Sequence, residues 1–151
     1  MEIETLLNLV DFKSTMEEIY ERIIIIKTKK PESHDINKDL QWFSRSLGLF
    51  SDRDKEKSCF RIFIELVKAS KEDQRLKSND IAERSHLTRA TVIHHLNNLM
   101  ERGLVISKNN KYLLRENNFE ELLEDIEKDF TRIFKDLKRK ARELDKELET
   151  F

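Results

Sequence analysis

The residues with the clearest capacity for chemistry lie between positions 88 and 97, in the stretch TRATVIHHLN. If this stretch is helical, residues three and four positions apart share a face. One face is apolar and carries Val92, Leu96 and Leu99. The opposite face is polar and begins with short side chains; it carries Ala90, His94, Asn97 and Glu101, and Thr91 and Ile93 flank it. The pattern predicts a helix that its apolar face holds in place while a compact polar face points outward.

That polar face has the chemistry needed in a DNA groove. Short side chains let a helix approach the groove floor, where threonine and alanine contact thymine methyl groups and asparagine and histidine hydrogen-bond to base edges. Arginine and the positive N-terminus of a helix suit the flanking phosphates. We therefore predict DNA contacts from this helix through Thr88, Arg89, Ala90, Thr91, His94 and Asn97, with a further contact from Ser78 before it. The alternative is an ordinary solvated helix face.

The preceding residues predict the elements that would position this helix. Ser78 and Asp80 suit the first turn of a short helix near 79–85, because polar and acidic side chains stabilise helix N-termini. A turn follows at residues 85–86, and the hydroxyl of Thr88 can cap the next helix. A short helix, a tight turn and a longer helix together predict a helix-turn-helix.

A small hairpin is predicted directly after that longer helix. Gly103 ends the helix, and residues 104–107 and 112–115 have the composition of two short strands. The turn between the strands is KNNK, and asparagine tolerates the positive φ angles of a tight hairpin. Its lysines, Lys108 and Lys111, would lie over the phosphate backbone or the minor groove. With this basic tip the hairpin would be the wing of a winged helix.

Residues 79–105 resemble the winged-helix repressors of the ArsR type and their archaeal relatives. The matching residues are Ile81, Ala82, Leu87, the run TVIHHL at 91–96, Leu99 and the run GLV at 103–105. The family pattern is close to TVSHHL…L…GLV, and the resemblance extends from residue 52 to residue 115. It implies that the residues facing DNA are Thr88, Arg89, Ala90, Ile93, His94 and Asn97. Ile93 stands where the family usually has serine, and His86 stands where it has glycine or asparagine.

Many members of that family sense metals through clusters of cysteine and histidine, which this sequence lacks. The chain has one cysteine, Cys59, which we expect in the core. His94 and His95 are adjacent, so on a helix they diverge by about 100° and cannot share a metal ion. We predict no metal site and no cofactor. A phosphate loop, a nucleophile elbow and an HExxH motif are also absent from the sequence, so an enzyme is the least favoured class.

The first 50 residues predict a helical extension. Apolar residues at steps of three or four suggest a helix over residues 3–26: Leu6, Leu9, Phe12, Met16, Ile19, Ile23 and Ile26. The β-branched run at 23–26 could instead form a short strand. Asp35 is placed to cap a second helix that ends at Gly48. Ser51 is placed to cap a third, roughly 52–70, which is apolar on several sides and should be buried.

Residues 118–151 predict one long helix, because they contain neither glycine nor proline. Its apolar residues alternate at steps of four and three, with one extra step of four: Phe119, Leu123, Ile126, Phe130, Ile133, Leu137, Ala141, Leu144, Leu148 and Phe151. At 1.5 Å per residue the helix would be roughly 50 Å long, too long for one small core to cover. A second copy of the chain is the simplest partner. The alternative is a helix folded back on the N-terminal helix of the same chain.

Charge and composition bound the remaining possibilities. The net charge of −1 is divided unevenly: residues 51–115 carry 14 basic and 9 acidic side chains, whereas residues 116–151 carry 8 and 12. A polyanion would be attracted to the basic middle and repelled from the acidic end. The longest purely apolar run is four residues, far short of the ~20 that a membrane span needs. We expect a cytoplasmic protein with no secretory signal and no membrane segment.

These observations combine into one prediction. The fold is mainly α with a small β-hairpin wing: a helical extension (1–50), a winged helix-turn-helix (51–115) and a coiled-coil dimerisation helix (116–151). The expected function is sequence-specific binding of double-stranded DNA, in a homodimeric transcriptional regulator or repressor that recognises a pseudo-palindrome. The homodimer would form through the C-terminal helix, with the N-terminal helix as a further contact. The alternative is a winged-helix module that binds proteins in a transcription or other assembly.

Overall fold

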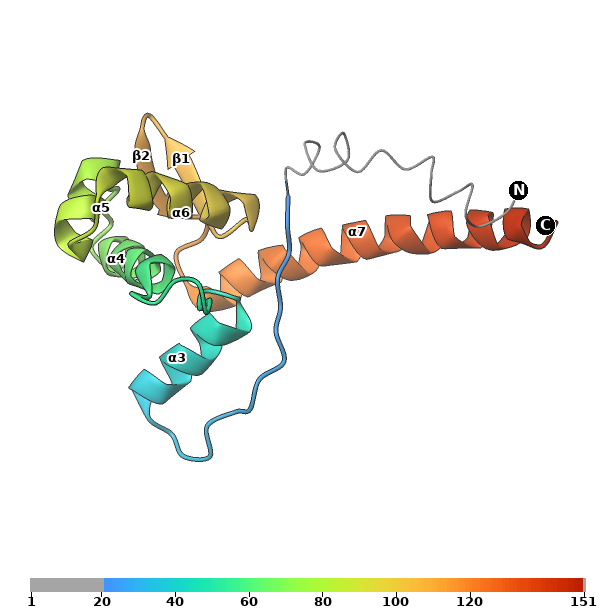
Figure 1. Cartoon of the computed structure of the whole chain (residues 1–151), viewed down its shortest axis with the longest axis horizontal. Helices are drawn as coiled ribbons and strands as arrows, with labels where there is room; N and C mark the ends of the chain where they lie inside the picture. The colour runs from blue at the N-terminus through green and yellow to red at the C-terminus, as the bar shows by residue number, and fades with distance from the viewer. Residues whose placement is uncertain (1–20, 151) are drawn as a thin grey trace.

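The computed structural model describes residues 21–150, and it is mainly helical with one two-stranded hairpin (Figure 1). The elements in order are α3 (Ile36–Ser46), α4 (Ser58–Lys71), α5 (Ser78–Ser85), α6 (Arg89–Glu101), β1 (Val105–Lys108), β2 (Lys111–Leu114) and α7 (Phe119–Leu148). The predicted class, a winged helix with a long C-terminal helix, is confirmed. Among the helices of residues 21–150, none has the length and apolar character to cross a membrane.

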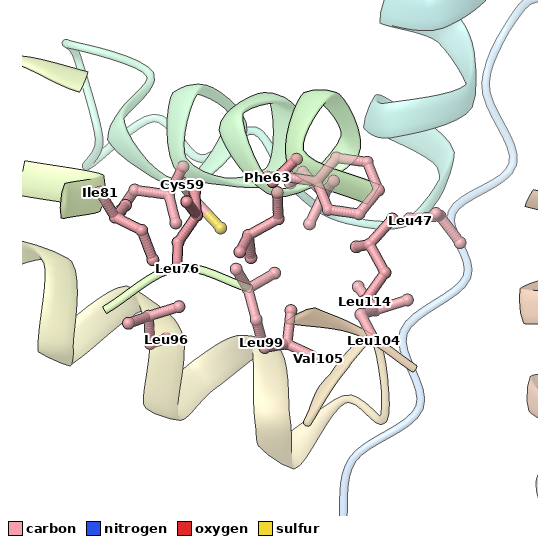
Figure 2. Close-up of a cluster of buried hydrophobic side chains, with 14 of the residues drawn as sticks. Leu47, Cys59, Phe63, Leu76, Ile81, Leu96, Leu99, Leu104, Val105 and Leu114 are labelled. Carbon is pink, nitrogen blue, oxygen red and sulfur yellow. The ribbon is translucent and has the colours of Figure 1, made fainter. Parts of the chain in front are cut away.

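The core lies between α4 on one side and α5, α6 and the hairpin on the other. Figure 2 shows Cys59 and Phe63 of α4 pointing toward Leu96 and Leu99 of α6. Leu104 and Val105 at the start of the wing and Leu114 at its end belong to the same cluster. Its other members include side chains that are at most 1% exposed: Ile62, Phe63, Leu66, Ile81, Val92, Leu96, Leu99 and Leu122. The predicted burial of α4 is therefore correct, because α4 packs against α5, α6 and β2.

Residues 21–30 correct the predicted N-terminal helix. They form no helix and no strand but run in an extended path along the body (Figure 1). Two backbone bonds hold this path: the Arg22 N–H donates to Glu101 O at 2.8 Å, and the Ile26 N–H donates to Ser46 O at 2.7 Å. These bonds reach elements distant in sequence, so local periodicity did not reveal them. The predicted positions from Leu6 to Ile19, like Phe151 at the other end, lie outside the described residues.

The helix α3 begins where its sequence predicts. The carboxylate of Asp35 accepts hydrogen bonds from the Asn37 and Lys38 N–H groups at 2.8 and 3.3 Å. Gly48 follows the helix with a φ of 71°, in the left-handed region that favours glycine. A Cβ at this position would lie 2.7 Å from Cγ2 of Ile24, so the extended segment also needs glycine here.

The helix α4 begins at Ser58, so the prediction of a helix from residue 52 was wrong. Ser51 does not cap it; the Ser51 hydroxyl accepts from the Arg53 N–H at 3.3 Å within a turn. Asp54 takes that role, since its two carboxylate oxygens accept from the Ser58 and Cys59 N–H groups, each at 2.9 Å. Residues 51–57 therefore form a loop that exposes charged side chains.

The wing is a two-residue hairpin with Asn109 and Asn110 at its turn. Their φ angles are 53° and 61°, the conformation that such a hairpin requires at both positions. The pairing places Lys108 opposite Lys111, one residue beyond the predicted strand ends. Leu76 forms an additional bridge to Tyr112 in β2, which ties the wing to the chain before α5. Because Tyr112 pairs with Ser107 next to the Lys108–Lys111 pair, this bridge holds the wing near its turn.

The helix α7 has 30 residues and a length of about 45 Å. The Asn118 side chain caps it by accepting from the Glu121 N–H at 2.8 Å. Its first turns pack onto the body through Leu122 and Ile126, and the remainder extends away from it (Figure 1). The predicted apolar stripe is therefore divided: its start belongs to the core of this chain, and its continuation remains exposed.

Candidate nucleic-acid interface

The structure places the predicted contact residues of α6 along one outward side of that helix. Val92, Leu96 and Leu99 are fully buried and hold α6 against the body. The exposed set is Thr88, Arg89, Ala90, His94 and Asn97, and Thr91 and Ile93 are half-buried at its edge. No described element covers this face. It is therefore available to a ligand that approaches from outside.

The first turn of α6 is fixed by two threonines. Thr88 caps the helix, because its hydroxyl accepts from the Thr91 N–H at 3.2 Å. The same hydroxyl donates its proton to the Thr91 hydroxyl at 2.9 Å. Since Thr91 accepts in that bond, its own hydroxyl proton stays available to an acceptor such as a phosphate or base oxygen. The local structure thus orients one free donor at the start of the helix.

The turn between α5 and α6 is held by hydrogen bonds on both sides. His86 has a φ of 55°, which confirms the predicted left-handed position in place of the usual glycine or asparagine. The Leu87 N–H donates to Ala82 O at 3.0 Å, and the Ser85 hydroxyl donates to Ile81 O at 2.5 Å. Arg61 of α4 also donates to the Ser85 carbonyl group. These bonds fix the angle between the two helices.

The other predicted contact residues lie on separate elements. Ser78 is the first residue of α5 and is half-buried. At the N-terminus of α5 the carboxylate of Asp80 accepts from the Lys77 N–H at 3.1 Å. Lys108 and Lys111 are exposed beside the wing turn, as predicted. The hairpin register brings the two lysines together.

Cationic side chains in the loop before α4 also lie beside α6, although their local sequence did not predict it. Arg53 and Lys55 line a hollow of about 530 Å³ together with Thr91, His94 and His95 of α6. Both loop residues are exposed. The alternating acidic and basic residues at 52–57 were predicted as a helix, so nothing in the local pattern placed them beside the exposed side of α6. Only the tertiary fold brings them there.

One side chain of α6 turns inward at the edge of this hollow. His95 is half-buried, and its Nε2 atom lies 4.0 Å from Oδ2 of Asp54. Burial lowers the pKa of His95, and the Asp54 carboxylate partly opposes that shift. For Asp54, burial raises the pKa, but the hydrogen bonds from the Cys59 and Ser58 N–H groups outweigh burial and lower it. His95 therefore supports the loop, whereas His94 faces solvent.

The thiol of Cys59, which is buried next to this loop, is in its unreactive protonated form. Burial raises the pKa of Cys59 to about 11, so the thiol stays protonated at neutral pH. Within residues 21–150, no group of three or more histidine, cysteine, aspartate or glutamate side chains has the arrangement to hold a metal ion.

A second hollow, of about 500 Å³, lies away from α6. It is lined by Trp42 and Phe43 of α3, by Phe119 of α7 and by the loop around Pro31. Phe50, which follows α3 in sequence, does not line this hollow. It stacks on Phe60 of α4, with ring centroids 4.8 Å apart.

The helix-turn-helix, the outward face of α6 and the basic wing define the class: a winged helix-turn-helix. A family model described as winged helix-turn-helix DNA-binding matches residues 64–106, from the middle of α4 to β1. The match includes the whole of α5 and α6 and supports a DNA-binding regulator. No curated protein matches the chain. No solved structure matches it either.

Proposed function

We propose that the chain is a homodimeric, sequence-specific regulator of transcription that acts as a repressor on a pseudo-palindromic operator. The observation that carries this proposal is the geometry of α6: Val92, Leu96 and Leu99 are buried while the opposite face is exposed and compact. Such a helix fits the major groove, where His94 and Asn97 would contact base edges and Arg89 a phosphate. The repressor role follows the resemblance to winged-helix repressors of the ArsR type and their archaeal relatives.

The wing and the N-terminus of α5 would contact the DNA backbone on either side of the base contacts. Lys108 and Lys111 would neutralise phosphates or enter the minor groove, and Ser78 would donate to a phosphate oxygen. Contacts of this kind fix the register of the protein on DNA without selecting its sequence. Specificity would then come from α6.

The exposed part of α7 supports the proposed dimer. Its large apolar side chains remain between 37% and 60% exposed in a single chain: Leu123, Phe130, Ile133, Phe134, Leu137, Leu144 and Leu148. Apart from Phe134, which directly follows Ile133, they lie on the predicted coiled-coil stripe, so a second α7 is the partner that matches them along their whole length. The chain would thus consist of an N-terminal extension (1–50), a DNA-binding unit (51–115) and a dimerisation helix (116–151), and would act in the cytoplasm.

Dimerisation matters because one winged helix makes few base contacts. Two copies related by a twofold axis would bind two half-sites about 10 base pairs apart or at a multiple of that distance. The acidic C-terminal helix would point away from the duplex, since like charges repel.

Selection of bound DNA from a random pool tests the proposal directly. We expect enrichment of an inverted repeat, and Arg89→Ala and His94→Ala should each weaken binding to it by about 1–3 kcal/mol, roughly 5- to 150-fold. Arg139→Ala, on the exposed part of α7, is the matched control and should bind as the unchanged chain does. Enrichment of no sequence, or full affinity in both α6 variants, would refute the proposal.

The exposed stripe of α7 also favours a second candidate, a winged-helix module that binds proteins in an assembly. In that case the apolar stripe would take a different protein chain, and DNA would bind weakly and without sequence preference. The same selection separates the two functions, because a module of this kind would enrich no inverted repeat.

A further inference from the structure

Arg115 connects the wing to α7 at the place where that helix leaves the body. It follows β2 directly, and its backbone N–H donates to Leu104 O at 3.0 Å. Its guanidinium Nη1 donates to Oδ2 of Asp129 at 2.6 Å, and Nε lies 3.4 Å from Oδ2 of Asp125. The two carboxylates are one helical turn apart on α7. A single side chain of the wing therefore holds two successive turns of the long helix.

Asp129 is the last buried residue of α7. It is 6% exposed, whereas residues 130–150 are all exposed. Arg115 lowers the pKa of Asp129, burial opposes that shift, and Arg132 on the next turn of α7 supports it. Asp129 is thus an ionised carboxylate with two arginine partners. Loss of Arg115 would leave a buried charge held only by Arg132, from the same helix.

The end of α6 meets this ion pair as well. At Gly103, directly after α6, a Cβ atom would lie 3.1 Å from Nη1 of Arg115 and 3.8 Å from Oδ2 of Asp129. Glycine at this position leaves room for the guanidinium. The DNA-facing helix, the wing and the long helix therefore converge on one charged contact.

The contact lies near the start of a long projecting helix, so a small change in its geometry causes a large displacement at the far end of α7. The 19 residues of α7 from Phe130 to the end of the helix project about 28 Å beyond it. A tilt of about 10° at Asp129 would move the far end by about 5 Å, which exceeds the roughly 3.4 Å rise of one base pair. Small changes at the contact would thus change where two α6 helices stand in a dimer.

We propose that Arg115, through Asp125 and Asp129, is the positioning residue that sets the spacing and rotational phase of the two half-sites. This inference rests on the proposed dimeric DNA-binding function. In this arrangement α6 selects the base sequence of each half-site, and the Arg115 contact selects the distance between them. Arg115 itself touches no DNA.

A spacer series tests the proposal. The selected inverted repeat is lengthened or shortened by one to three base pairs, and affinity is measured for the unchanged chain, Arg115→Met and Arg139→Met. The control removes an exposed arginine–carboxylate pair, Arg139–Asp136, that lies within α7 and joins no other element. We expect the unchanged chain and the control to lose about tenfold or more on a two-base-pair change, and Arg115→Met to lose less than about threefold. Binding to a single half-site should be equal in all three.

A distance measurement gives an independent readout without DNA. Ser107 is exposed on β1, and Ser107→Cys places one spin label on each wing of the dimer, while Cys59 is buried and is replaced by serine in every variant so that it takes up no label. We expect a narrow distance distribution for the unchanged background and for Arg139→Met, and a broad one for Arg115→Met. Arg115→Lys keeps the positive charge but cannot bind both carboxylates with one planar group, so the width of its distance distribution should lie between those of the unchanged chain and Arg115→Met. It serves as the test variant if Arg115→Met does not fold.

The outcomes separate this inference from the function on which it rests. If the unchanged chain is monomeric or enriches no repeat, both fail. If the unchanged chain binds a repeat as a dimer but the Arg115 variants keep its steep spacer preference and narrow distance distribution, only the inference about Arg115 is overturned. Weaker binding of the Arg115 variants to a single half-site would also overturn it, because Arg115 would then act within one DNA-binding unit.

Discussion

The substitution Leu137→Ala should weaken the proposed dimer strongly. Leu137 is the most exposed of the large apolar side chains on α7, at 60%. Full burial of a leucine side chain is worth about 1.5–3 kcal/mol, so the exposed 60% has about 1–2 kcal/mol still to gain from a partner. The substitution occurs in both chains of a dimer, which doubles the loss to about 2–4 kcal/mol. The dissociation constant should rise about 30- to 700-fold.

Sedimentation equilibrium over a range of protein concentrations measures this constant. Lys135→Ala is the matched control, because Lys135 is exposed on the same part of α7 but faces away from the apolar stripe. Leu137 lies beyond Asp129, the last buried residue of α7, so thermal unfolding of the monomeric winged helix should be unchanged by either substitution. A dissociation constant that is the same for Leu137→Ala and Lys135→Ala would show that the stripe does not hold two chains together.

Three further predictions test the wing, the loop before α4 and the base of α7. The double substitution Lys108→Ala with Lys111→Ala should reduce the slope of log affinity against log salt concentration by up to about two units, since each lost phosphate contact accounts for about 0.9. An unchanged slope in DNA titrations would mean that the wing does not touch DNA. Asp54→Ala should lower the free energy of unfolding in urea by about 1 kcal/mol, because the cap of α4 is lost. It should also lower the pKa of His95 further in an NMR titration, because the carboxylate that raises this pKa is gone, and an unaltered His95 pKa would contradict the pairing. Asp129→Asn should destabilise the chain fully above about pH 4 and progressively less below it. The folded pKa of Asp129 lies below its unfolded value, so its stabilisation is complete above the unfolded value and is lost as pH falls through the folded one. A stability gap that stays constant down to pH 2 would argue against an ionised Asp129.

The helix α6 and the wing could be predicted because their signals are local. The apolar spacing of α6, the capping hydroxyl of Thr88 and the asparagine pair at 109–110 each act within a few residues, and the structure has all three where the sequence placed them. Local hydrogen bonds and helical periodicity do not depend on the rest of the chain. They can therefore be recognised without it.

The remaining features depend on contacts between distant residues. Residues 23–26 have the composition of a helix or a strand, but the backbone of residues 22–26 is held at its two ends by Glu101 and Ser46, which lie far away in sequence. Asp54 lies inside the predicted helix that starts at residue 52, so its capping role is visible only once the start of α4 at Ser58 is known. Arg115 and Asp129 resemble ordinary surface charges, because nothing in a stripe of alternating charges shows which one becomes buried.

The close approach of Ile24 to Gly48 links two positions that no local rule connects. A glycine that serves only its positive φ angle can be exchanged for asparagine at modest cost, but here the methyl group of Ile24 occupies the space that any Cβ would need. Relatives that keep the extended N-terminal segment should therefore retain glycine at position 48, and relatives that have lost it should be free to vary there. Joint variation at positions 24 and 48 among such relatives would show from sequence alone which of them fold their N-terminus in this way.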